Sequence, residues 1–175
     1  MILARLILGL LSLSPMTGYE LKKHFDSSIN HFWNADKAQI YRTLTKLVQD
    51  GHATVTVIRQ SNYPDRQEHH ITELGREMLV QWLQTDVTAH IPREPFMARL
   101  FFAAELDRTG VVDLVEARRV ATQDLLDDYL SQREDIDMRA AADRRSFLMA
   151  ATLDNSIRHQ EAELQWLEAV AEHLP

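Results

Sequence analysis

The sequence predicts a mainly α-helical protein that contains one short β-hairpin. Three observations support this fold class. Residues 1–50 show helical apolar spacing with two breaks, residues 53–72 contain two strand-like stretches around a polar turn, and residues 91–175 show helical spacing only. Three helices followed by a β-hairpin is the element order of an N-terminal winged helix-turn-helix with a two-stranded β-wing. We expect a C-terminal α-helical dimerisation domain to follow it.

The first three helices have identifiable ends. The first is predicted from Ile2 to Ser12, before a break at Pro15. Thr17 and Glu20 fit a capping box, in which each side chain bonds the backbone N–H of the other, so the second helix starts there. The third helix is predicted at 34–50 and ends at a glycine. Its inward apolar stripe consists of Ile40, Leu44, Leu47 and Val48.

The wing is predicted from two strands, 53–60 and 67–72, which flank a polar tip at 61–66. Thr72 can cap a further helix that runs through Trp82. Two prolines, at 92 and 95, then bracket a linker. We therefore expect a DNA-binding domain at residues 1–90 and a helical domain at residues 91–175.

The last helix carries apolar residues at alternating steps of three and four, which is the spacing of a coiled-coil seam. This spacing favours a dimer interface between two copies of the chain. An amphipathic helix that packs on its own subunit is the alternative. The predicted interface consists of Leu153, Ile157, Gln160, Leu164 and Leu167.

Composition excludes several kinds of site. The 175 residues include no cysteine, so disulfides and thiolate metal sites are excluded, and we expect no cofactor. Adjacent His69 and His70 point to opposite faces of a strand, which argues against a shared metal ion. No glycine-rich phosphate loop or nucleophile elbow is present, so an enzyme is not expected. The apolar start of the chain is too short to span a bilayer, and we expect a cytoplasmic protein without a membrane partner.

The net charge of −7 is unevenly distributed. Residues 1–90 carry as many basic as acidic side chains, so residues 91–175 account for the whole excess. The four lysines lie in the second and third predicted helices. Attraction to phosphates acts over roughly 8 Å at physiological salt, so the charge of the local face matters more than the total. This distribution favours DNA binding by the first half of the chain.

An ordered set of short motifs resembles the PadR family of transcriptional regulators, in its longer subclass with a C-terminal helical dimerisation domain. The motifs are Leu8-Gly9-Leu10-Leu11, Met16-Thr17-Gly18-Tyr19-Glu20-Leu21, Gln39-Ile40-Tyr41, Asp50-Gly51, Ile71-Thr72-Glu73-Leu74-Gly75, Arg93-Glu94-Pro95-Phe96 and Leu100-Phe101-Phe102. The resemblance implies a homodimeric, ligand-responsive repressor that binds an inverted-repeat operator in double-stranded DNA. It also implies that Tyr19 and Tyr41 lie near the DNA backbone. Arg42 stands where the family commonly has proline, and His69 where it has an aromatic residue.

Candidate DNA contacts lie on the predicted third helix, the second helix and the wing. Gln39 and Arg42 can each bond two base edges at once, whereas Lys37 and Lys46 suit phosphates. A solvated helix face is the alternative for this group. A protein-interaction module that has kept the winged-helix shape without binding DNA is the alternative function. The full candidate set is Tyr19, Lys22, Lys37, Gln39, Tyr41, Arg42, Thr43, Lys46, Arg59, Asn62 and Arg66.

Aromatic side chains in the second half are candidates for an effector pocket. The family resemblance implies a small aromatic or drug-like effector, because several relatives respond to such compounds. Aromatic residues at helical spacing also occur as ordinary core, which is the alternative. The candidates are Phe96, Phe101, Phe102, Tyr129 and Trp166.

Overall fold

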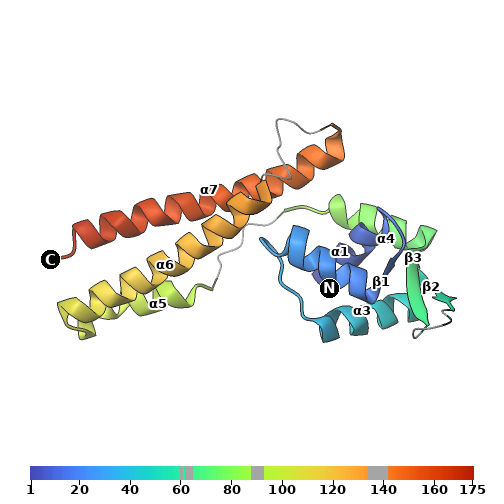
Figure 1. Ribbon diagram of the computed structural model, residues 1–175, viewed down its shortest axis with the longest axis horizontal. Coiled ribbons are helices and arrows are strands. Elements are labelled where there is room, and N and C mark those ends of the chain that lie inside the picture. The colour runs from blue at the N-terminus through green and yellow to red at the C-terminus, as the bar shows by residue number, and fades with distance from the viewer. Residues whose placement is uncertain (60, 62–64, 88–92, 134–141) are drawn as a thin grey trace. The chain divides into compact units, whose positions relative to one another are not determined.

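The computed structural model describes residues 1–59, 61, 65–87, 93–133 and 142–175. The chain divides into two units, Met1–Thr88 and Ala89–Pro175. The first unit combines helices with a small antiparallel sheet, and the described part of the second unit is helical (Figure 1). The predicted fold class, a winged helix-turn-helix followed by a helical region, is confirmed. Among the described residues, none of the helices combines the length and apolar character needed to span a bilayer.

Three helices of the first unit precede the wing: α1 (Ile2–Leu11), α2 (Gly18–His24) and α3 (Lys37–Gln49). The capping box at the start of α2 forms as predicted, since the Thr17 hydroxyl accepts from the Glu20 N–H and the Glu20 carboxylate accepts from the Thr17 N–H. A π-helical turn, η1 (Phe25–Ile29), continues α2. Helix α3 begins three residues later than predicted because Asp36 caps it.

The sheet contains three strands instead of the two predicted. Strand β2 (Ala53–Ile58) pairs with β3 (Arg66–Ile71), and β1 (Met16–Thr17) pairs with the other edge of β3. All pairs are antiparallel. A two-residue strand has no periodicity of its own, so the sequence pattern at β1 indicated only a helix break. The consequence is that the wing is fastened to the start of α2.

The core of the first unit surrounds α1. Ile7 and Leu8 are fully buried, and they pack with residues of α2, α3 and the sheet. Helix α4 (Glu73–Leu83) covers α1 and begins as predicted at Thr72, whose hydroxyl accepts from the Gly75 N–H at 3.1 Å. Only glycine fits at position 75, because a Cβ there would lie 2.2 Å from the His52 carbonyl oxygen.

The second unit is built around a long antiparallel helical hairpin of α6 (Arg108–Arg133) and α7 (Arg144–Glu172), with α5 (Pro95–Phe101) and the 3₁₀ turn η2 (Ala103–Glu105) before it. Two separate buried clusters hold it together. One joins the end of α6 to the first half of α7 through Leu126, Tyr129, Leu153 and Ile157. The other joins α5, the start of α6 and the end of α7 through Phe96, Val115 and Leu167.

This packing overturns the predicted dimer seam. Leu153, Ile157 and Leu167 are at most 2% exposed because they contact α5 and α6 of the same chain. Leu164 and Gln160 are half-buried, and Leu164 packs against the cluster of Leu153. The a/d spacing therefore reports an intrachain helix pair, which was the alternative. Both arrangements produce the same pattern in one helix, so the spacing alone could not separate them.

Candidate nucleic-acid interface

The outermost line of α3 consists of residues on the side opposite its buried stripe. Successive residues turn by about 100°, so Ala38, Arg42, Thr45 and Gln49 lie opposite Ile40, Leu44 and Leu47. All four are exposed, whereas Ile40, Leu44 and Leu47 are at most 3% exposed. The sequence pattern indicated Arg42 but not the other three residues. These three residues could have been predicted from the sequence, because helix geometry places them opposite the apolar stripe.

The first turn of α3 is fixed by a second capping box. The Gln39 N–H donates to Asp36 Oδ1 at 2.7 Å, and the Asp36 N–H donates to Gln39 Oε1 at 3.2 Å. The amide oxygen that Gln39 would offer to a base is therefore already engaged. In this structure the Gln39 side chain caps the N-terminus of α3.

The prediction that Thr43 lies on the outward face is wrong. Thr43 is 5% exposed, and its hydroxyl donates to the Gln39 carbonyl oxygen at 2.7 Å. Position 43 falls beside Ile40 and Leu44 on the helix, so its side chain turns toward α1 instead of solvent. Thr43 is therefore not available as a DNA contact.

Most candidate cations near α3 have a local partner. Lys22 pairs with Asp26, and Lys46 Nζ lies 3.1 Å from Asp50 Oδ2. Lys37 Nζ lies 5.8 Å from the centroid of the Tyr41 ring. Arg59 is exposed, and Asn62 lies outside the described residues. Such exposed ion pairs contribute about 0–1 kcal/mol, so a phosphate can replace the carboxylate.

Arg42 differs from these cations. It is exposed, and within the described part of the chain it makes no hydrogen bond or ion pair. A guanidinium without a partner keeps all its donors available for a ligand. Arg42 is therefore the side chain on the outermost line of α3 with the greatest capacity to bind a charged or base-edge acceptor.

Tyr41 packs across the start of α2. A Cβ at Gly18 would lie 2.7 Å from Cζ of Tyr41, so the ring occupies space that only glycine leaves open. Tyr19 beside it is 71% exposed. Both tyrosines line a hollow of about 680 Å³, which is also lined by Lys23 of α2 and by Arg66, the first residue of β3. The two hydroxyl-bearing rings thus lie between α3 and the wing.

Glu20 joins the wing to α2, a function that the sequence did not reveal. Arg66 Nη2 donates to Glu20 Oε1 at 2.8 Å, while Glu20 Oε2 accepts from the Thr17 N–H at 2.8 Å. The bond from the Thr17 backbone, assisted by Arg66, lowers the pKa of the Glu20 carboxyl. The carboxylate is therefore charged near neutral pH and holds Arg66 beside the tyrosine pair.

His69 lies at the centre of the sheet, opposite Met16 on one side and Val55 on the other. It is 7% exposed, and burial lowers the pKa of its imidazole. Its Nδ1 atom is buried without a hydrogen-bond partner among the described residues. A neutral imidazole thus occupies the position where the family has an aromatic residue, and the wing forms around it.

The five aromatic residues predicted to line one effector pocket do not come together. Phe96 and Trp166 form an edge-to-face pair with centroids 6.3 Å apart. Phe101 and Phe102 pair with each other at 5.0 Å, and both are exposed. Tyr129 belongs to the other buried cluster. Within one chain these side chains therefore do not line a single pocket, because helical spacing does not reveal which cluster a side chain joins, and the effector pocket stays a prediction.

A capped helix with an exposed polar line, a preceding helix with an exposed tyrosine and a β-wing define a winged helix-turn-helix protein. The profile of the transcriptional regulator PadR-like family matches residues 7–81, and that of the virulence activator alpha C-terminal family matches residues 92–174. The probable transcriptional regulator Rv1176c of Mycobacterium tuberculosis is 30% identical, over 99% of this chain and 98% of that protein. This chain belongs to the PadR-like family of transcriptional regulators.

Other relatives agree with this assignment. The negative transcriptional regulator PadR of Bacillus subtilis is 26% identical over 94% of this chain and 92% of that protein. The crystal structure of B. subtilis PadR in complex with operator DNA has the same fold over the whole of both chains, with a TM-score of 0.90 and 23% identity. The same protein in complex with p-coumaric acid matches 98% of both chains, with a TM-score of 0.81 and 23% identity.

Proposed function

We propose that this protein is a dimeric, sequence-specific DNA-binding repressor that a small aromatic effector releases from its operator. The relatives support the class of partner. B. subtilis PadR is a negative transcriptional regulator, and its structures contain operator DNA in one case and p-coumaric acid in another. The proposal assigns DNA binding to residues 1–90 and dimerisation to residues 91–175.

The observation that carries the proposal is the free outermost line of α3. Ala38, Arg42, Thr45 and Gln49 are exposed, and the helix that presents them is anchored by a capping box and a buried stripe. An α-helix of this kind fits the major groove, where guanidinium and amide groups read base edges and small side chains contact thymine methyl groups. In the proposal, Arg42 reads a base.

The surrounding groups position the helix on the DNA backbone. Lys37 and Lys46 neutralise phosphates beside α3, and Lys22 and Arg66 exchange their carboxylate partners for phosphates. Tyr19 and Tyr41 donate their hydroxyls to the backbone between α3 and the wing. Arg59 contacts the flanking backbone.

Dimerisation is assigned to a different surface from the one that the heptad spacing indicated. Phe101 and Phe102 are 82% and 69% exposed, and Met97 and Leu106 beside them in sequence are about half exposed. Exposed aromatic clusters of this kind mark protein interfaces. We propose that a second copy covers this surface, so that two copies of α3 enter successive major grooves of an inverted repeat.

Fluorescence anisotropy with a duplex from the protein's own upstream region tests the proposal. The wild type should bind this duplex more tightly than a shuffled duplex, with an affinity that falls steeply as salt increases. Arg42→Ala should remove the preference for the upstream duplex. Arg76→Ala, which changes an exposed arginine of α4, is the matched control and should leave it intact.

A protein-interaction module without DNA binding is the second candidate. The net charge of −7 favours it, as does the pairing of Lys22, Lys46 and Arg66 with carboxylates. An affinity that is weak and does not change with salt would support this candidate and contradict the first.

A further inference from the structure

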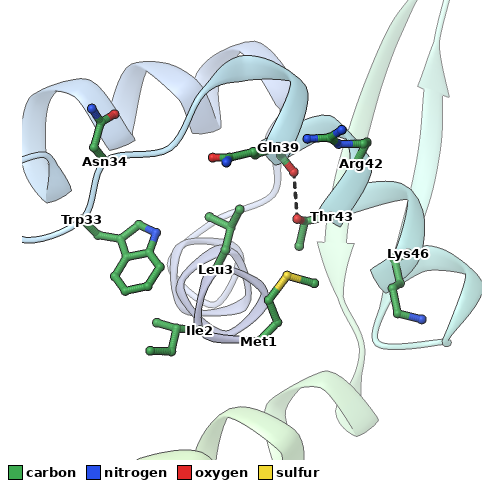
Figure 2. Close-up of a pocket in the computed structure, with 9 residues that line it drawn as sticks. All are labelled: Met1, Ile2, Leu3, Trp33, Asn34, Gln39, Arg42, Thr43 and Lys46. Atoms are coloured by element: carbon green, nitrogen blue, oxygen red, sulfur yellow. Dashed lines mark hydrogen bonds between the residues drawn. The ribbon is translucent and has the colours of Figure 1, made fainter. Parts of the chain in front are cut away.

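Helix α3 has a hollow on each flank, and the two hollows differ in charge. The hollow of about 590 Å³ that faces α1 is lined by the first turn of α1, by Trp33 and by one side of α3 (Figure 2). Among the described residues that line it, the charged side chains are the cations Arg42 and Lys46. The hollow of about 680 Å³ on the other flank contains charges of both signs. We call this second hollow, which Tyr19 and Tyr41 line, the tyrosine hollow.

The fixed charges of the tyrosine hollow cancel. Among the described residues that line it, the cations are Lys23 and Arg66, and the carboxylates are Glu20 and Asp65. Arg66 Nη2 donates to Glu20 Oε1 at 2.8 Å. The Lys23 side chain is exposed and has no hydrogen bond or ion pair within the described chain. A phosphate that binds Lys23 and the tyrosine hydroxyls therefore leaves the hollow with a net negative charge.

His69 is the side chain of this hollow that can change its charge near neutral pH. It lines the hollow from β3 and is 7% exposed. Burial lowers the pKa of the imidazole, and a hydrogen bond with the Met16 backbone opposes this change only in part. The Nδ1 atom is buried without a partner among the described residues, so it is the ring atom that is free to take up a proton.

The titratable and charged groups around His69 come from three elements. They are Tyr19, Glu20 and Lys23 of α2, Tyr41 of α3, and Asp65, Arg66 and His70 of β3 and the residue before it. Strands β1 and β2 place Met16 and Val55 opposite His69, and neither titrates. Helix α1 also contacts β3, and its one charged residue is Arg5. His70 opposes a second positive charge, so an anion in the hollow is needed to favour the imidazolium.

We propose that the tyrosine hollow holds one phosphate of the DNA backbone, and that His69 takes up a proton when this phosphate binds. The proposal rests on the proposed function, which assigns the DNA backbone to Tyr19 and Tyr41, and it adds Lys23 and His69 to that contact. The proton compensates the charge that the phosphate brings. Proton and operator then strengthen each other's binding by the same factor.

The direction of the pH dependence follows from this linkage. The phosphate raises the pKa of His69 in the complex above its value in the free protein. Operator binding therefore becomes tighter as the pH falls through the interval between these two pKa values, and it is constant above and below that interval. A phosphodiester of the DNA backbone keeps its charge throughout, so the imidazole is the group that titrates.

Calorimetry of the upstream duplex at about pH 6.5, in buffers of different ionisation enthalpy, counts the protons that binding takes up. The wild type should take up as much as about one proton per protomer. At constant ionic strength, its apparent Kd should be about ten-fold lower at about pH 6 than at about pH 7.5. Binding without proton uptake overturns this proposal alone. If the wild type binds no duplex at either pH, the proposed function fails and this proposal fails with it.

Two variants of β3 assign the proton. His69→Phe keeps a ring in the sheet and should bind the duplex without proton uptake. His70→Gln, which changes the adjacent histidine on the other face of the strand, is the matched control and should keep the uptake. Uptake that persists in His69→Phe, or that His70→Gln abolishes, assigns the proton to another group and overturns the proposal.

Nuclear magnetic resonance titration of the His69 ring tests the wild type without any substitution. The pKa of His69 should be higher in the complex with the duplex than in the free protein, and an unchanged pKa overturns the proposal. Inorganic phosphate at the same ionic strength should have much less effect, because α3 and the wing hold the DNA backbone but not a lone anion. An equal rise with inorganic phosphate would make the hollow a site for free phosphate and overturns the assignment to DNA.

Discussion

The two units differ in how completely each buries its own apolar surface. The described part of the first unit has one continuous cluster of fifteen buried apolar residues, which links α1, α2, α3 and the sheet. Among its described residues, the second unit has two smaller clusters, of four and three residues, and leaves Phe101 and Phe102 exposed. A unit that buries its apolar residues in one core can have a polar binding surface. A unit that leaves aromatic rings exposed is stabilised when a partner covers them. The difference supports the proposal that the first unit recognises DNA and the second unit dimerises.

Introducing negative charges at the exposed aromatic pair tests the proposed dimerisation of the second unit, and it has the largest expected effect. The double substitution Phe101→Asp, Phe102→Asp should raise the dimer dissociation constant by about a thousand-fold, since buried aromatic anchors contribute about 2 kcal/mol or more each. Sedimentation velocity measures the shift to monomer. Val87→Asp introduces one such charge at a fully solvated apolar residue of the first unit and should not change the measured mass. A double variant that stays dimeric would place the interface elsewhere.

Removing buried side-chain volume from the second unit should lower the stability of that unit and leave the stability of the first unit unchanged. Ile157 is 1% exposed in the cluster that joins α6 to α7. Ile157→Ala should lower the free energy of unfolding by about 2–5 kcal/mol, through lost burial and the cavity that remains. Calorimetry should show the transition of the second unit at a lower temperature, with that of the first unit unchanged. A single transition that shifts as a whole would mean that the two units unfold together.

Truncating Arg42 tests the working face of the first unit. Arg42→Ala should weaken binding to the upstream duplex by about 1–3 kcal/mol if the guanidinium reads a base, with little loss on shuffled DNA. Equal loss on both duplexes would make Arg42 a phosphate contact. Thr45→Val provides a comparison on the same line of α3, because it replaces a hydroxyl with a methyl group of similar volume. Its thermal unfolding should match that of the wild type.

The sequence predicted the first unit better than the second for a physical reason. Capping residues such as Thr17, Asp36 and Thr72 act within a few residues, so a local pattern reveals them. The bond between Arg66 and Glu20 spans 46 residues, and nothing local to either residue indicates it. The helices of the second unit could also be predicted, from the spacing of their apolar residues. Whether Leu153 faces its own chain or another is decided by packing, which spacing does not encode.

The smallest expected effect concerns His69, whose imidazole is buried at the centre of the sheet of the first unit. Burial lowers the pKa of the imidazole below its ordinary value of 6.5, so the unfolded chain binds protons more readily than the folded one. The free energy of unfolding is therefore highest above pH 6.5. It decreases as the pH falls below that value and becomes constant again below the pKa of His69 in the folded state. His31 shifts in the same direction, also through burial, and adds to the same window.

His69→Phe should separate the two histidines. The substitution removes the titrating group and the unpaired Nδ1 atom while keeping a ring between Met16 and Val55. Thermal unfolding at about pH 7.5 and about pH 5.5 should show a smaller loss of stability for the variant than for the wild type, with the remainder due to His31. His159→Phe, on an exposed face of α7, is the matched control. If His69→Phe keeps the full pH dependence, the imidazole of His69 is protonated as easily in the folded chain as in the unfolded chain. Protonation of His69 then does not lower the free energy of unfolding.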